Sequence, residues 1–239
     1  MPSGARSGKS DEFRRTLSRS LGLVFLLTVP SSVGLAVLGE PIVATFYQGG
    51  AFTLFDTRQT AMALACYAVG LAGYSAVKIL APAFYALGDS RTPMIVSLVS
   101  IAINYIAAST MVRVAGLGHA GLALSTSTVA TFNFLLLFGV LRIRIGGIHG
   151  RELLSSVFKV IAASAVMGAV CFASSHVMRE WLGISKMARL ADLAVSVPLG
   201  LGCFYSVARA LRLAEMEMAA AAIAGPLMRR LRISRAKMN

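Results

Sequence analysis

The chain has 239 residues, of which 56% are hydrophobic and only 14% charged, and its formal net charge is +13. An ordinary soluble domain is about 45–50% apolar and about 25% charged. The composition therefore nearly excludes a water-soluble globular protein, and it excludes intrinsic disorder, which requires low hydrophobicity. Cys66, Cys171 and Cys203 each lie inside an apolar run without a Cys-x-x-Cys motif or a Cys/His cluster, which argues against a disulfide framework and a zinc site.

Six apolar stretches approach the length of about 20 residues that a helix needs to cross a bilayer. They are Leu21–Leu38, Thr60–Leu87, Met94–Val112, Leu117–Leu141, Leu153–Val177 and Leu190–Leu211. They lack the alternation of barrel strands, and backbone groups cannot stay unpaired in hydrocarbon, so each stretch is predicted to be a helix. The first stretch is too long for the apolar part of a signal peptide. We therefore expect an all-α membrane protein with six transmembrane helices.

The basic residues are distributed unequally between the two sides of the membrane that six spans define. Sixteen Arg and Lys residues lie on the side of the termini and five on the other side. Because basic residues accumulate on the cytoplasmic side, both termini are predicted to be cytoplasmic. The net charge then reflects topology and lipid contact, and we expect no nucleic-acid partner.

This division gives five segments along the chain. Residues 1–20 form a basic N-terminal segment, 21–141 hold four spans, 142–152 form a basic loop, 153–211 hold two further spans and 212–239 form a basic tail. In the tail, apolar residues recur at helical spacing and five basic residues follow; the apolar residues are Leu213, Met216, Ala220, Ile223, Leu227 and Leu231. The tail is either a helix on anionic lipid headgroups or a solvated basic segment.

Lys78 lies deep inside the second predicted span. A lysine near the bilayer centre costs about 2.5–3.5 kcal/mol on insertion scales, so such a residue usually faces a bundle interior or a wet cavity. At about 100° per residue, Tyr67, Tyr74, Tyr85 and Lys78 share one narrow arc, and Pro82 lies on the same general side. We interpret this stripe as lining a cavity. The alternative is a lysine that snorkels to the interface among interfacial tyrosines.

Polar side chains also occur in the third and fourth spans. Asn104 lies near Ser97 and Ser100 on one helix face, and Thr126 and Asn133 are seven residues apart and so share a face of the next span. Most residues of this kind bond neighbouring helices. Asn104, Thr126 and Asn133 are nevertheless candidates for a cavity wall.

The sequence carries no pattern of an enzyme. It lacks a His-Glu-x-x-His motif, a phosphate-binding glycine-rich loop, paired carboxylates within a span and a Ser/His/Asp arrangement on one surface. We therefore predict neither catalysis nor a bound cofactor or metal.

Three ordered motifs resemble one transporter family, the MurJ (MviN) lipid II flippases of the MATE-like superfamily. They are Gln48–Thr53 (QGGAFT) followed by Asp56, Lys78–Tyr85 (KILAPAFY) followed by Gly88–Pro93 (GDSRTP), and Gly118–Ser125 (GHAGLALS). The resemblance covers about residues 11–141, in the family's order and spacing.

The resemblance implies that the chain corresponds to the last six helices of a fourteen-helix, two-lobed flippase. Residues 21–141 would then be four helices of the second lobe, and 153–211 the two additional helices whose groove takes the polyprenyl tail of the substrate. Family members translocate undecaprenyl-diphosphate-linked peptidoglycan precursor across the bacterial inner membrane for cell-wall synthesis. The implied partners are lipid II, anionic membrane lipids and a separately encoded N-terminal lobe.

Two candidate residues have counterparts in the family pattern. Lys78 matches a lysine of the helix that lines the second lobe. Asn104 matches an asparagine that belongs to a sodium site in some members, but the acidic residue expected one turn later is Ala108 here, so that site looks incomplete.

Two alternatives to lipid II transport stay open at this point. One is a flippase or exporter of another lipid-linked oligosaccharide or of a drug. The other is a truncated or split half that does not transport without a separate first lobe.

Overall fold

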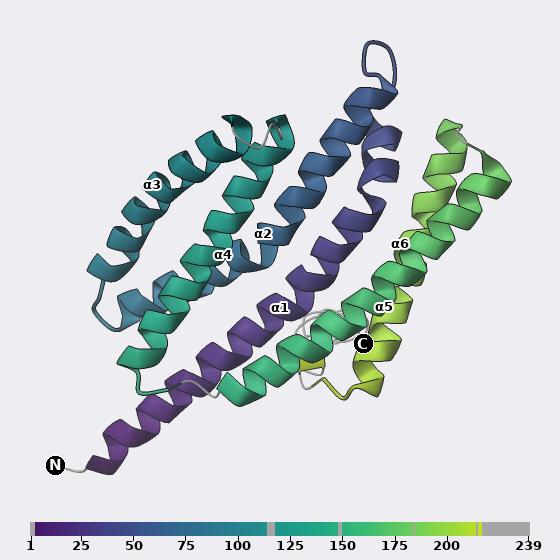
Figure 1. The fold of residues 1–239 in the computed structure, drawn as a ribbon. Coiled ribbons are helices and arrows are strands. Elements are labelled where there is room, and N and C mark those ends of the chain that lie inside the picture. Colours follow the sequence, from purple (N-terminus) through teal and green to yellow (C-terminus); the bar gives the residue numbers. More distant parts are fainter. Residues whose placement is uncertain (1–2, 114–117, 148–149, 184, 214, 217–239) are drawn as a thin grey trace, which may run out of the picture.

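Six helices follow one another in the computed structural model, which describes residues 3–113, 118–147, 150–183, 185–213 and 215–216 (Figure 1). They are α1 (Ser3–Tyr47), α2 (Leu54–Ala86), α3 (Arg91–Arg113), α4 (Gly118–Arg144), α5 (Gly150–Leu182) and α6 (Lys186–Ala210). Each is long and apolar enough to cross a membrane. All six predicted spans are therefore confirmed as helices. The tail prediction falls mainly on residues 217–239, which lie outside the described residues.

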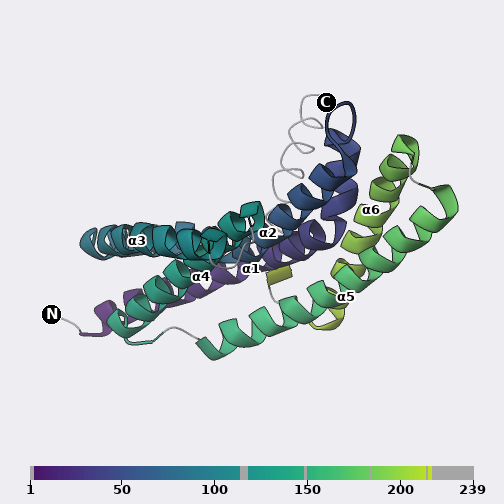
Figure 2. The same ribbon diagram turned by 45° about the horizontal axis from the view of Figure 1, so that its top comes forward.

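The helices stand in a row that has α1 and α2 at its centre. α2 packs against α1 and α4, and α3 packs mainly against α4. α5 packs against α1 and α6. Figures 1 and 2 show α3 and α4 on one side of this central pair and α5 and α6 on the other.

Helix α1 begins well before Leu21, where the first apolar stretch begins in the sequence. The reason is that Phe13, Leu17 and Leu21 follow one another at four-residue spacing on one helix face. Leu17 and Leu21 are buried, and Phe13 packs against the same cluster. Arg15 and Arg19 are exposed, whereas the half-buried Arg14 donates a hydrogen bond to the Ile145 carbonyl at the end of α4. The helix therefore continues through a segment that is too basic for its hydropathy alone to predict a membrane span.

Two apolar clusters form the core, and α1 contributes to both. The first lies mainly between α1, α2 and α4, where Leu21, Leu80, Phe84 and Leu141 are fully buried, and it also includes Val96 of α3 and Leu153 of α5. The second joins α1 to α5 and α6 through side chains such as Leu26, which is 2% exposed. Helix α1 therefore holds the two halves of the chain together.

The contact between α2 and α4 depends on two glycines. A Cβ atom on Gly70 would lie 2.5 Å from the Cα of Ser127, and one on Gly73 would lie 3.0 Å from the Cα of Thr131. The Ser127 hydroxyl also donates a hydrogen bond to the carbonyl of Cys66 at 2.6 Å. Small residues and interhelical hydrogen bonds are the usual means by which membrane helices associate closely.

Asp89 connects the start of α3 to the end of α4. Its carboxylate accepts hydrogen bonds from the backbone N–H groups of Arg91 and Thr92 and from the Thr92 hydroxyl, and it pairs with Arg144. The hydrogen bonds from Thr92, reinforced by Arg144, hold the pKa of Asp89 below its usual range, although burial acts in the opposite direction.

We expect Asp89→Asn to lower the thermal stability of the chain at neutral pH and to have less effect in acid. A depressed pKa means that the carboxylate stabilises the fold above the unfolded pKa of about 3.9 and loses this effect as pH falls through the folded value. The measurement is the Tm difference between wild type and Asp89→Asn in detergent across this pH range. The exposed Glu12, which forms no ion pair with another described residue, supplies the control variant, Glu12→Gln. A Tm difference that stays constant into acid would contradict the assignment.

Candidate functional site

The predicted stripe lies on an exposed face of α2. Tyr67 is 51% exposed and Tyr74 and Tyr85 are each 57% exposed, and Lys78 and Pro82 are also exposed. Because residues 54–86 form one helix, these side chains share the arc that their spacing predicts. The structure thus brings together the lysine and the tyrosines on one surface of the central helix pair.

The Lys78 ammonium is held by an aromatic ring within the stripe. Its Nζ atom lies 4.6 Å from the centre of the Tyr74 ring, a cation–π contact. Tyr74 is one turn before Lys78, whereas the near end of α2 at Ala86 is eight residues after it, about 12 Å away at 1.5 Å per residue. The contact holds the ammonium beside a neighbour on the same stripe, and the choice between a cavity wall and a snorkelling lysine stays a prediction.

The other three candidates lie on α3 and α4. Thr126 is exposed, and Asn104 and Asn133 are half-buried. The Asn133 side-chain oxygen is buried and has no hydrogen-bond partner among the described residues. No hydrogen bond within the described part of the chain joins these three residues to the α2 stripe, so their role in a cavity wall stays a prediction. One turn after Asn104, Ala108 offers no side-chain ligand for sodium.

An apolar groove runs between α1, α5 and α6, with a volume of about 740 Å³. Its walls include Leu27 and Pro30 of α1, Met167 of α5 and Leu201 and Phe204 of α6. Sequence motifs do not mark this groove, because its walls come from segments more than a hundred residues apart.

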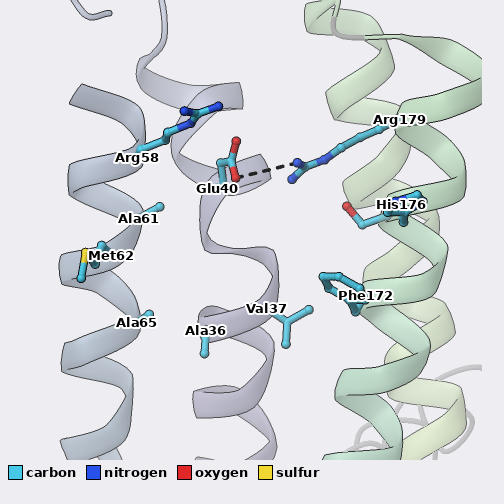
Figure 3. Close-up of a pocket in the computed structure, with 11 residues that line it drawn as sticks. Ala36, Val37, Glu40, Arg58, Ala61, Met62, Ala65, Phe172, His176 and Arg179 are labelled. Atoms are coloured by element: carbon cyan, nitrogen blue, oxygen red, sulfur yellow. Dashed lines mark ion pairs between the residues drawn. The ribbon is translucent and has the colours of Figure 1, made fainter. Parts of the chain in front are cut away.

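A second cleft, of about 360 Å³, opens between α1, α2 and α5 near the end where α1 leads into α2. Figure 3 shows Arg58, Glu40 and Arg179 at its mouth and Val37 and Phe172 farther along its walls. Glu40 pairs with Arg179 at 3.8 Å. No sequence motif marks these charges, because three separate helices bring them together.

A third cavity, of about 570 Å³, lies between the first half of α1, the start of α5 and the residues that follow α6. It is lined by polar and charged side chains, among them Arg19, Lys159 and Arg212. Lys159, like Lys78, lies inside a predicted span. It belongs to α5, so it is not part of the stripe on α2.

Comparisons with known proteins agree with the three motifs. The model of the family "Lipid II flippase MurJ" matches residues 1–191. The "Probable lipid II flippase MurJ" of Bdellovibrio bacteriovorus is 31% identical over 202 residues, which are 84% of this chain and 38% of that protein. The "Lipid II flippase MurJ" of Burkholderia cenocepacia is 39% identical over 135 residues, 56% of this chain and 26% of that protein.

A solved structure supports the fold. "Lipid II flippase MurJ, inward closed conformation" aligns with a TM-score of 0.65 at 24% identity, covering 83% of this chain and 40% of that one. The chain spans about two fifths or less of the length of these relatives. The predicted resemblance and the predicted all-helical membrane fold are confirmed, and the chain belongs to the MurJ lipid II flippase family.

Proposed function

We propose that this chain forms the second-lobe part of a flippase that carries lipid II, the undecaprenyl-diphosphate-linked peptidoglycan precursor, across the bacterial inner membrane. The observation that carries the proposal is the family match over residues 1–191. The exposed stripe of Lys78 and three tyrosines on α2 adds a chemical reason, because a lysine on a cavity wall suits an anionic diphosphate.

In this proposal, transport follows alternating access. Two lobes rock about a central cavity, and Lys78 contributes positive potential where the diphosphate passes. Tyr67, Tyr74 and Tyr85 form the wall, joined by Asn104, Thr126 and Asn133 from the neighbouring helices. The apolar groove of α1, α5 and α6 takes the polyprenyl tail, whose hydrocarbon suits its walls of Leu27, Met167 and Phe204. The protein moves its substrate without changing a covalent bond.

The remaining partners and the orientation follow from charge and length. The distribution of basic residues supports cytoplasmic termini and supports contact of the tail with anionic lipids. The lobe that completes the cavity is supplied by further helices, in the same protein or as a separate chain.

A chimera tests this proposal directly. The part of the Bdellovibrio relative that aligns with this chain is replaced by residues 1–239, and the chimera is expressed in cells depleted of their own flippase. We expect growth and normal cell shape with the chimera, and no rescue by residues 1–239 expressed without a partner. Rescue by these residues alone would contradict the need for a first lobe. A membrane-inserted chimera that fails to rescue would contradict the assigned function.

A further inference from the structure

We propose that Asp192 and three serines between α5 and α6 form a binding site for a monovalent cation of the size of sodium. Asp192 belongs to α6 and is only 3% exposed. Its two carboxylate oxygens accept hydrogen bonds from the hydroxyls of Ser175 on α5, at 2.7 Å, and of Ser196 on α6, at 2.8 Å. The Ser196 hydroxyl also lies 3.0 Å from that of Ser174 on α5. Both helices therefore supply oxygens to one buried cluster.

The carboxylate of Asp192 lies inside a membrane-spanning helix without a charged partner. Within the described part of the chain, none of the ion pairs includes it. An unpaired carboxylate is so costly to remove from water that buried charges in proteins are paired with an opposite charge, bound to a metal ion or neutralised by a proton. The serine hydroxyls satisfy the carboxylate oxygens but bring no positive charge. A bound cation supplies that charge.

The arginines nearest to Asp192 along α5 and α6 are held by groups on α1. Arg189 is three residues before Asp192 on α6, but it donates a hydrogen bond to the Gln48 side chain. Arg179 of α5 pairs with Glu40 at 3.8 Å. These contacts direct both guanidinium groups toward α1, and neither forms an ion pair with the carboxylate of Asp192.

The oxygens of the cluster suit one small monovalent ion. Carboxylate and hydroxyl oxygens are typical ligands of hard cations, and the neighbouring oxygens here lie 2.7 to 3.0 Å apart. Because oxygens bind such cations at about 2.3–2.6 Å, neighbours this close can share one ion once the hydroxyl hydrogens turn away from it. Among the described residues, no three His, Cys, Asp or Glu side chains gather as they do at a zinc site. The single carboxylate therefore matches an ion of charge +1.

Two clefts offer an ion a path to the cluster. Asp192 lines a cleft of about 320 Å³ between α1, α2, α5 and α6, and Ser175 lines the cleft of about 360 Å³ in Figure 3. Both clefts also contain Glu40 and Arg58, so charges of both signs line the path. The distribution of basic residues supports an approach from the side opposite the cytoplasm.

The cation site is separate from both features that the proposed function uses. None of the four side chains that form it lines the apolar groove, so a hydrocarbon tail and the ion can be bound at the same time. Lys78 belongs to α2, which has no residue in the cluster. Because the ligands come from α5 and α6, the bound ion would hold these two helices together.

The test is equilibrium binding of radioactive sodium to the purified 239-residue chain in detergent, with choline chloride keeping the ionic strength constant. We expect saturable binding of one sodium ion per chain. The Tm should rise with sodium concentration, by about 3–6 °C at ten times the Kd, because an ion that binds only the folded state stabilises it. Neither readout involves transport, so this proposal and the proposed function fail independently.

Three variants locate the ion. Asp192→Asn keeps the shape of the side chain and is expected to abolish both sodium binding and the Tm shift. Its Tm in choline alone should equal or exceed that of wild type, because a buried charge is removed. Ser175→Ala and Ser196→Ala each remove one ligand and are expected to weaken the Kd about tenfold.

Two matched controls accompany these variants. Ser206→Ala removes an exposed hydroxyl of α6 that bonds only to the Gly202 carbonyl of its own helix. Glu12→Gln removes an exposed carboxylate. Both should bind sodium as wild type does. Absence of sodium binding by wild type, or undiminished binding by Asp192→Asn, would overturn the proposal. A wild-type chain that is stabilised by acid and not by sodium, with this effect lost in Asp192→Asn, would overturn it in favour of a proton.

Discussion

Lys78→Glu is expected to abolish rescue by the chimera, and Lys78→Ala to weaken it. Two unit charges 4 Å apart interact by about 4 kcal/mol at the effective dielectric of a protein surface. Reversing the charge therefore converts attraction for the diphosphate into repulsion of similar size. A loss of only about 1.4 kcal/mol of binding free energy already weakens the affinity for the diphosphate about tenfold. The measurement is the growth of flippase-depleted cells that express each variant, with equal amounts in the membrane verified by immunoblot.

Two variants separate the role of Lys78 from a general effect on α2. Lys78→Arg keeps the charge and is expected to retain most rescue. Val69→Ala changes a side chain that is 66% exposed and lies on roughly the opposite side of the helix, and it is expected to behave as wild type. Growth of Lys78→Glu cells at the wild-type rate would show that the stripe does not meet the substrate.

Gly70→Ala is expected to lower the stability of the chain substantially, although it adds a single methyl group. The new Cβ would lie 2.5 Å from a backbone Cα on α4, a separation that requires the two helices to move apart. Overpacking of this kind costs about 1–3 kcal/mol, whereas Gly→Ala at an open helix position gains about 0.5–1 kcal/mol. The measurement is thermal unfolding of the purified chain in detergent.

Gly139→Ala is the matched control for this prediction. Gly139 is also inside a helix, and a Cβ atom there would meet no atom within 4 Å. Its Tm should equal or exceed that of wild type, while the Tm of Gly70→Ala falls. Similar Tm values for the two variants would mean that α2 and α4 do not pack as closely as the structure shows.

The helices and the lysine on α2 are predictable from sequence because their signals are local. A run of apolar residues defines a span wherever it occurs, and Lys78 is conspicuous because its neighbours Val77 and Ile79 are apolar. The start of α1 is less predictable, because Phe13 and Leu17 are isolated apolar residues in a basic segment. Their packing against the core, which stabilises the helix there, depends on residues far away in the sequence.

The clefts and cavities were not predictable, because their walls come from distant parts of the chain. Glu40 and Arg179 form an ion pair although 139 positions separate them in the sequence. Arg19, Lys159 and Arg212 look like unrelated basic residues until the packing of α5 and α6 against α1 places them around one cavity. Interhelical packing decides these sites, and no local pattern encodes it.

The most direct test of the account is translocation of fluorescently labelled lipid II by the purified chimera in proteoliposomes. We predict that the wild-type chimera moves lipid II between leaflets and that the folded Lys78→Glu variant does not. Movement of lipid II by Lys78→Glu at the wild-type rate, or failure of the folded wild-type chimera to move it, would contradict the proposal that the α2 stripe of this chain lines the path of lipid II.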